Sequence, residues 1–292
     1  MVDGKTIPGL KPETTMTVAA KKILSARLNA VTQRLKPAAT IFHEDDEHVH
    51  QLRVASRRAD ASLRMFVDYL PAKRVVQARE TLRTLRRAAG PARDWDVFRT
   101  LIVDAKPNDP LKYFLLGIST HHRHHVQKPL EAVITDELTE WPKLARALPA
   151  AVDASSKTNF GEVIDEQVQS LVKKMVRHLD RVSPTTSILE LHRLRILGKR
   201  LRYTLELAPG PQADAKMLGA LEHLQDILGD WHDAHAAWEH LTAAKQAAAS
   251  ANGVLHPSLH QGLNSLIKRY EKQNVKQSQL FGRWLKQWNV KQ

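Results

Sequence analysis

The sequence predicts an all-α protein made of two similar halves, each of which forms a four-helix bundle. Three observations predict this fold class. Apolar residues recur at i, i+3, i+4 and i+7 in nearly every segment between turn signals, and no segment alternates over the length of a strand. A block near position 50 recurs near position 192, which indicates an internal duplication. Hydrophobic residues make up 42% of the chain, which is enough to build a core.

The helices follow from this periodicity, and each expected break coincides with proline, glycine or other turn residues. The breaks fall at Pro71, Gly90-Pro91, 106–110, Ser183-Pro184, Pro209 to Pro211 and Asn252-Gly253. In chain order, the predicted helices cover 16–36, 46–70, 73–89, 92–105, 110–131, 159–182, 187–208, 213–228, 231–250 and 257–288. The expected organisation is a flexible segment at 1–15, a first bundle half at 16–148, a linker at 149–158 and a second half at 159–292.

The duplication rests on two repeated blocks that keep their order and nearly their spacing. The block from His50 to Arg58 recurs 142 residues later, from His192 to Arg200. A second set recurs at an offset of 139, in which Leu82, Leu85, Gly90 and Asp94 correspond to Leu221, Leu224, Gly229 and Asp233. Two blocks in register favour two bundles of about four main helices each, related by an approximate two-fold axis.

Composition excludes several classes of protein. The chain has no cysteine, which excludes disulfides, Cys-ligated zinc, iron-sulfur clusters and thiol nucleophiles, and favours the reducing cytosol. The first fifteen residues carry no apolar core of a signal peptide, and no apolar run approaches the roughly 20 residues of a membrane span. The 44 Lys and Arg residues against 31 Asp and Glu residues give a net charge of +13, which suits a polyanionic partner.

A basic stripe lies on the helix predicted at 46–70. His50, Arg53, Arg57 and Arg64 fall within about 60° of one another at 100° per residue. The second half repeats the stripe with His192, Arg195 and Lys199, and Arg202 lies close to it. Glu206 stands at the position that corresponds to Arg64. Stacked arginines repel one another, and guanidinium groups bind phosphate oxygens in pairs. A single basic helix would most often be a solvated face, but the repetition favours a bound polyanion.

Four motifs occur in order along the chain: His-x-x-Arg-Val-x-x-Arg-Arg at 50–58, Gly-Pro-Ala-Arg-Asp-Trp-Asp at 90–96, the block 192–203 ending Lys-Arg-Leu-Arg-Tyr, and Leu-Gly-Asp at 228–230. Together they resemble the CHAD family, the conserved histidine alpha-helical domain, over about residues 15 to 290. The resemblance implies two antiparallel four-helix bundles around a basic central channel that holds inorganic polyphosphate. It also implies that the protein associates with polyphosphate granules in the cytoplasm. It also implies a binding protein, and a stand-alone one, since the Glu-x-Glu-x-Lys signature of the triphosphate-tunnel domains fused to some relatives is absent.

Carried over by position, the resemblance places polyphosphate binding on the two stripes. The expected binding residues are His50, Arg53, Arg57, His192, Arg195, Lys199 and Arg202, and Arg64 joins them by helical phase. A second rank of candidates comprises Arg58, Arg200, Arg27, Arg34, Lys174, Arg177, Arg181, Arg123, Lys268 and Lys272. The further stripe Arg79, Arg83, Arg86 and Arg87 is expected mostly on the outer surface, because its charge is not kept at the corresponding positions of the second half.

No catalytic residue, cofactor or metal is expected. The acidic residues before His50 favour a helix start, with Asp45 or Asp46 as the cap, over a metal site. Asp94 and Asp233 are expected to cap helices or to pair with buried arginines. Two alternatives stay open: a nucleic-acid-binding protein, although its 16 aromatic residues mostly fall at core positions, and an enzyme that processes polyphosphate or transfers phosphate through His50 or His192.

Overall fold

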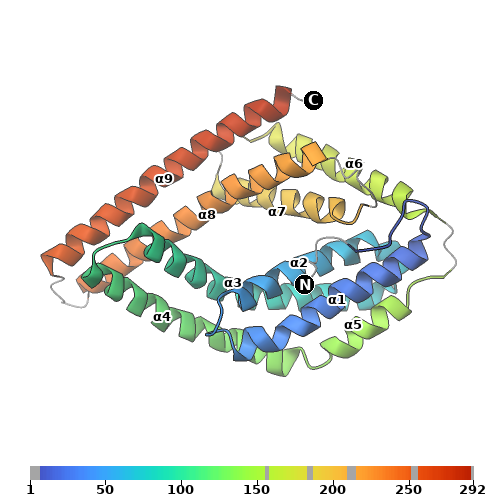
Figure 1. Cartoon of the computed structure of the whole chain (residues 1–292), viewed down its shortest axis with the longest axis horizontal. Coiled ribbons are helices and arrows are strands. Elements are labelled where there is room, and N and C mark those ends of the chain that lie inside the picture. The colour runs from blue at the N-terminus through green and yellow to red at the C-terminus, as the bar shows by residue number, and fades with distance from the viewer. Residues whose placement is uncertain (1–6, 155–157, 183–186, 209–214, 251–255, 291–292) are drawn as a thin grey trace. The chain divides into compact units, whose positions relative to one another are not determined.

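The computed structural model describes residues 7–154, 158–182, 187–208, 215–250 and 256–290, and this part of the chain is helical almost throughout (Figure 1). No strand occurs within these ranges, where the only β pairing is an isolated bridge between Thr15 and Asn159. The all-α prediction is therefore confirmed. No helix of the described part is long and apolar enough to cross a membrane.

The helices alternate with short turns. They are α1 (Met16–Thr40), α2 (Glu47–Met65), α3 (Ala72–Ala105), α4 (Asp109–Ala132), α5 (Trp141–Ala150), α6 (Phe160–Leu179), α7 (Ile188–Leu205), α8 (Ala215–Ser250) and α9 (Pro257–Val290). A 3-10 turn, Val67–Tyr69, follows α2, and a π turn, Val133–Glu137, follows α4. The expected breaks at 183–184, 209–211 and 252–253, and residues 1–6 of the expected flexible segment, lie outside the described residues.

Two predicted breaks are wrong, because α3 runs through Gly90-Pro91 and α8 runs through Gly229 without interruption. An interior proline costs a helix about 3 kcal/mol, since it removes a backbone donor and its ring crowds the preceding turn. Burial on both sides offsets this cost: Ala89 and Ala92, which flank the pair, are fully buried. The local turn signal is real, but packing along the whole of α3 outweighs it.

Helix α5 was not predicted, because it is short and ends in a segment that reads as a linker. It covers only ten residues and contains Pro149. Tertiary contact stabilises it: the buried Trp141 donates a hydrogen bond from Nε1 to Thr32 Oγ1 of α1, at 3.1 Å. The expected linker at 149–158 therefore begins inside the last turn of α5, and its residues 155–157 lie outside the described part.

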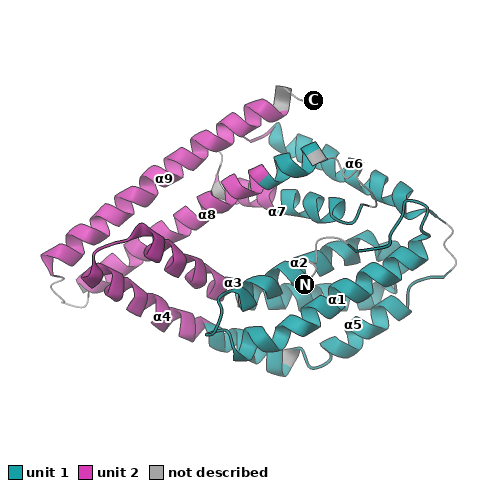
Figure 2. Cartoon of the chain, viewed as in Figure 1, with its two compact units in different colours: residues 1–90, 127–180, 196–222 teal, residues 91–126, 181–195, 223–292 magenta. Residues whose placement is uncertain are grey.

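The chain forms two compact units, each assembled from three stretches (Figure 2). Unit 1 comprises residues 1–90, 127–180 and 196–222, and unit 2 comprises residues 91–126, 181–195 and 223–292. This grouping follows spatial contact and not chain order, so helices α3, α4, α7 and α8 each supply residues to both units. The duplication of the sequence and its division into two halves stay predictions.

Each unit has its own apolar core. In unit 1, α1 packs along α2 and α5, and the Phe66 and Phe160 rings stack at 6.3 Å between centroids. In unit 2, Phe98 and Ile102 of α3 pack with Leu115 of α4 and with apolar residues of α8 and α9. These cores fix the helices from which the charged side chains extend.

Candidate functional site

Arginine side chains from three helices gather around one carboxylate in unit 1. Asp60 of α2 accepts hydrogen bonds from Arg64 Nε at 3.1 Å and from Arg79 Nε of α3 at 3.0 Å, and Arg86 Nη2 lies 3.8 Å away. Two more arginines, one on α2 and one on α7, interact electrostatically with this group. We call this group the Asp60 cluster, and its members are Asp60, Arg57, Arg64, Arg79, Arg86 and Arg200.

The Asp60 cluster contains five guanidinium groups and only one carboxylate, so positive charge is in excess. Burial lowers the pKa of Arg86, Asp60 opposes this shift, and Arg57, Arg64 and Arg79 add to it. Burial also lowers the pKa of Arg200, and Arg64 lowers it further. An arginine with a lowered pKa is one whose charge the protein does not fully compensate. The cluster is thus a preformed site of uncompensated positive charge.

A second group, the Glu206 cluster, comprises Glu206, Arg58, Arg202 and Arg27 of the same unit. Glu206, in the turn that follows α7, pairs with Arg58 Nε at 3.0 Å and lies 3.8 Å from Arg202 Nε. The guanidinium carbons of Arg58 and Arg202 lie 5.8 and 5.2 Å from the centre of the Tyr203 ring. Burial lowers the pKa of Arg27 to about 10, with a further lowering by Arg58, while Glu206 raises it. Arg202 Nη1 also lies 3.9 Å from Glu222 Oε1, so three arginines here face two carboxylates.

The repeated arginines lie against the repeated glycines. Arg53 Nη1 donates to the backbone carbonyl of Arg86 at 3.0 Å, and a Cβ added to Gly90 would lie 3.3 Å from the same Nη1. In unit 2, a Cβ added to Gly229 would lie 3.6 Å from Arg195 Nη2. Both glycines therefore sit where a guanidinium passes close to the helix. At Gly90 the approach is tight enough to disfavour a side chain, whereas at Gly229 the distance is that of an ordinary van der Waals contact and does not require glycine.

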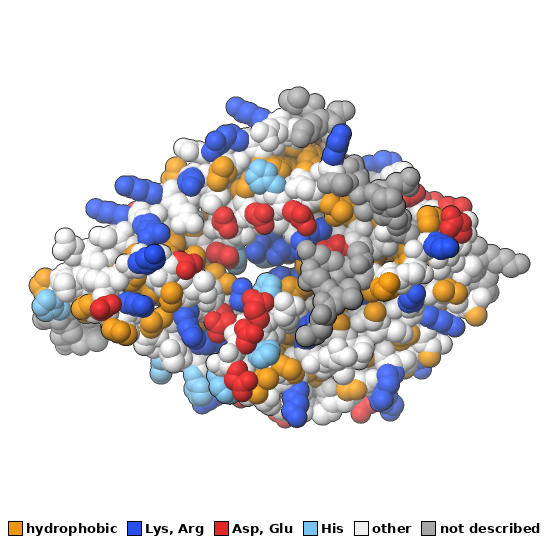
Figure 3. All heavy atoms as spheres, in the orientation of Figure 1, with side chains coloured by type: hydrophobic (Ala, Val, Ile, Leu, Met, Phe, Trp, Pro, Cys, Tyr) orange, Lys and Arg blue, Asp and Glu red, His pale blue; other side chains and the backbone are white. Residues whose placement is uncertain are grey.

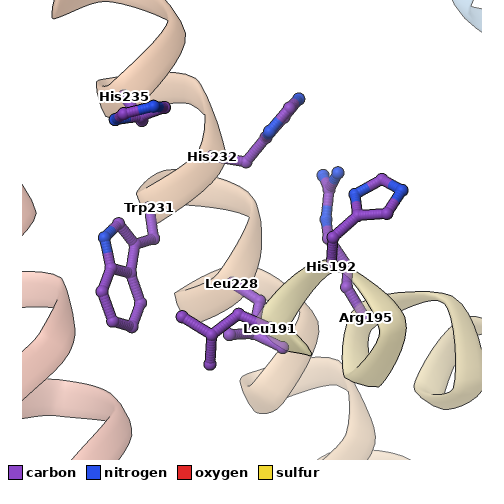
Figure 4. Close-up of a pocket in the computed structure, with 7 residues that line it drawn as sticks. All are labelled: Leu191, His192, Arg195, Leu228, Trp231, His232 and His235. Atoms are coloured by element: carbon purple, nitrogen blue, oxygen red, sulfur yellow. The ribbon is translucent and has the colours of Figure 1, made fainter. Parts of the chain in front are cut away.

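Unit 2 carries a histidine-rich pocket between α7 and α8 (Figure 4). His192 and Arg195 of α7 and His232 of α8 gather on one side of it, and Trp231 lies apart from them. The ring centroids of His192 and His232 are 6.3 Å apart. Imidazole and guanidinium groups in one place provide hydrogen-bond donors for an anion.

Several sequence candidates lie elsewhere. Arg123 is buried and its Nε contacts Asp96 Oδ1 at 2.5 Å, so its charge is used inside unit 2. Arg34 Nη1 donates to the carbonyl of Ala30 in its own helix. Two candidates of the first rank, His50 and Lys199, are half-buried. Lys174, Arg177, Arg181, Lys268 and Lys272 are exposed.

Of the stripe expected mostly on the outer surface, Arg83 and Arg87 are exposed, whereas Arg79 and Arg86 are half-buried beside Asp60, a role that the sequence does not predict. The expectation relied on the second half, where the corresponding positions carry no positive charge. Asp60 was also missed. The available signal was its position four residues before Arg64 on the basic helix, which is the spacing of an intrahelical ion pair.

Two further expectations concern carboxylates. Asp46 occupies the N-cap position of α2, but its side chain makes no capping hydrogen bond to the helix; Asp45, one residue earlier, accepts a hydrogen bond at Oδ1 from the backbone N–H of Glu47 at 2.8 Å. Asp94 and Asp233 do not cap helices, because α3 and α8 continue through them, and their pairing with buried arginines stays an expectation; the buried Arg123 pairs with Asp96. Among the residues that the structure covers, no three His, Asp or Glu side chains are placed to hold a metal ion.

Charge alone does not single out a site, since Lys and Arg side chains are spread over the visible surface of both units with Asp and Glu among them (Figure 3). What distinguishes the two arginine clusters is burial with an excess of one charge. Each cluster keeps its guanidinium groups close together at a cost in repulsion. A densely charged anion would offset that cost.

Comparisons with known proteins agree on the fold. A family model described as CHAD domain matches residues 22–242. The CHAD domain from the plant Ricinus communis has a similar structure, with a TM-score of 0.67 and 21% identity, over 96% of this chain and 94% of that chain. PptA from Streptomyces chartreusis is similar with a TM-score of 0.67 and 16% identity, over 94% of this chain and 100% of that chain. No curated protein matches the sequence.

Proposed function

The chain belongs to the CHAD domain family, and from this premise we propose that it is a non-catalytic receptor for inorganic polyphosphate. The Asp60 cluster is the observation that carries the proposal. Three arginines contact one carboxylate there, two more interact electrostatically with members of the group, and burial has lowered the pKa of Arg86 and Arg200. Such a site suits an anion whose charges follow one another closely along a chain.

Polyphosphate has the chemistry that these side chains require. Every internal phosphate carries a negative charge and oxygens that accept hydrogen bonds, and the polymer has no bases to stack on aromatic rings. A charge-assisted hydrogen bond contributes on the order of 1.5 to 3 kcal/mol before ordering costs. The residues that we propose for binding are the first-rank sequence candidates together with the added arginines of the Asp60 cluster. They are His50, Arg53, Arg57, Arg64, Arg79, Arg86, His192, Arg195, Lys199, Arg200 and Arg202.

The proposal extends to the place of action. A receptor for polyphosphate in the cytoplasm would associate with polyphosphate granules, as the sequence resemblance implies. No cofactor takes part in this binding.

Competition binding tests the proposal. Labelled long-chain polyphosphate is bound to the protein at about 150 mM salt, where weak non-specific contacts with polyanions are reduced, and is then challenged with unlabelled polyphosphate, DNA and RNA. We expect polyphosphate to compete far better than either nucleic acid. Equal competition by all three would overturn polyphosphate specificity, and phosphate release with or without magnesium would overturn the non-catalytic role.

A variant with matched control assigns the site. Replacement of Arg53, Arg57, Arg195 and Lys199 by alanine should weaken polyphosphate binding at least tenfold, because each side chain would contribute about 1 kcal/mol or more to the binding free energy. Circular dichroism should show unchanged helix content. The control replaces four exposed lysines and removes the same charge: Lys21, Lys36, Lys128 and Lys143. Equal loss in both variants would show that net charge, and not these positions, determines binding.

A further inference from the structure

We propose that Asp60 and Glu206 are positioning residues: Asp60 holds Arg64 and Arg79 by Nε, and Glu206 holds Arg58 by Nε, so that the Nη groups of these three arginines are presented to a phosphate chain. This inference rests on the proposed function and adds a role for two carboxylates in a site for polyanions. Their presence is unexpected on electrostatic grounds, because a negative charge near bound phosphate repels it.

The first argument is which nitrogen each arginine uses. Arg64 and Arg79 both contact Asp60 through Nε, at 3.1 and 3.0 Å. Arg58 contacts Glu206 through Nε as well, at 3.0 Å. A guanidinium group has five N–H donors, of which four are on Nη1 and Nη2. Contact through Nε therefore fixes the plane of the group and leaves its Nη donors for a second acceptor.

The second argument is the order of burial. The Asp60 side chain is 15% exposed, while its partners Arg64 and Arg79 are 37% and 32% exposed. Glu206 is 8% exposed, against 12% for Arg58 and 21% for Arg202. In each of these ion pairs the carboxylate is less exposed than the guanidinium group that it contacts, although Arg27 of the Glu206 cluster is itself buried. A polyanion that approaches from solvent meets the arginines of these pairs first, and the carboxylate lies behind them.

The third argument concerns mutual repulsion. Without Asp60, the guanidinium groups of Arg64, Arg79 and Arg86 would have like-charged neighbours and no shared acceptor. They would then separate and sample other rotamers, and binding would have to order them again. The repulsion that Asp60 exerts on phosphate is reduced, because three guanidinium groups surround its charge. Ordering therefore outweighs repulsion.

Neutral isosteres test the inference. Asp60→Asn and Glu206→Gln each remove one negative charge, so simple electrostatics predicts tighter binding of polyphosphate. We expect the opposite: a loss of affinity on the order of tenfold for each, because the arginines must be ordered on binding. The salt dependence should also become less steep, since fewer phosphates are contacted at once. Asp165→Asn, an exposed site of the same unit, is the matched control and should leave both quantities unchanged.

Each outcome has a distinct meaning. Wild-type protein that fails to bind polyphosphate overturns the proposed function itself. Wild-type binding with equal or tighter binding by Asp60→Asn overturns the positioning role and leaves the function standing. A merely structural role would lower the unfolding temperature of Asp60→Asn without changing the affinity of the folded protein or its salt dependence, and this also contradicts us. Should Asp60→Asn fail to fold, Asp60→Glu and Glu206→Gln give the answer, since Asp60→Glu restores the charge and should bind within about threefold of wild type.

Discussion

Alanine at the two corresponding glycines should have different effects on stability. In a helix interior, Gly→Ala stabilises by about 1 kcal/mol when the added methyl group meets no obstacle. At Gly229 the new Cβ would lie 3.6 Å from Arg195 Nη2, which is an ordinary van der Waals contact. We expect Gly229→Ala to raise the free energy of unfolding by about 0.5 to 1 kcal/mol.

Gly90 has a different environment from Gly229, although the two glycines correspond in the repeat. The Cβ would lie 3.3 Å from Arg53 Nη1, a nitrogen that is already held by the carbonyl of Arg86 at 3.0 Å. Pro91 follows directly, and a residue with a side chain before proline disfavours the helical conformation. These costs cancel the gain in helix propensity, so Gly90→Ala should be less stable than Gly229→Ala by about 0.5 to 1 kcal/mol.

Denaturant unfolding followed by circular dichroism measures both variants against wild type. The expected stabilisation by Gly229→Ala corresponds to a rise of about 2 °C in unfolding temperature for a chain of this size. Equal effects of the two substitutions, or destabilisation by Gly229→Ala alone, would refute the reasoning from these contacts.

Two further predictions concern unit 2. Asp96→Asn leaves the buried Arg123 without its counter-charge and should destabilise the protein by about 3 to 5 kcal/mol, as measured by denaturant unfolding. Acidification should also destabilise unit 2 through His240, whose pKa is lowered by burial although Asp94 and Glu239 oppose the shift. Because the pKa in the folded state lies below its unfolded value, the unfolded state binds more protons, so stability falls as the pH drops below about 6.5. His240→Gln should make the unfolding temperature depend less on pH between pH 8 and pH 5.

Matched controls accompany these two measurements. Glu190→Gln breaks an ion pair with Arg193, whose side chain is mostly exposed, and should cost less than about 1 kcal/mol. Loss of stability equal to that of Asp96→Asn would contradict the argument from burial. His122 also lies near His240 and lowers its pKa, so His122→Gln serves as the second control. A pH profile that changes with His122→Gln and not with His240→Gln would contradict the assignment.

The sequence predicts most of the helices but not where long helices continue. The spacing of apolar residues shows which side of a helix is buried, and it can be read from the local sequence alone. Whether Gly90-Pro91 ends a helix depends on the tertiary packing that buries Ala89 and Ala92, and local sequence signals do not report that packing. Helix α5 was missed for the same reason, since Trp141 is held by a residue more than a hundred positions earlier.

The candidate site was partly predictable. The basic stripe on α2 was found from helical phase, and Arg57 and Arg64 do belong to the Asp60 cluster. Arg79 and Arg86 were missed because their place beside α2 depends on how α3 packs. Glu206, which stands at the position of Arg64 in the repeat, was seen as a departure from the pattern. Its pairing with Arg58 shows that this departure supplies a counter-charge.

A structure of the protein with long-chain polyphosphate bound would test the central claim most directly. We predict phosphate oxygens within about 3 Å of Nη atoms of Arg57, Arg64 and Arg79, with Asp60 still in contact with Nε of the latter two. A polyphosphate chain that instead lay along the exposed lysines of α9, with the Asp60 cluster contacting no phosphate, would contradict the account.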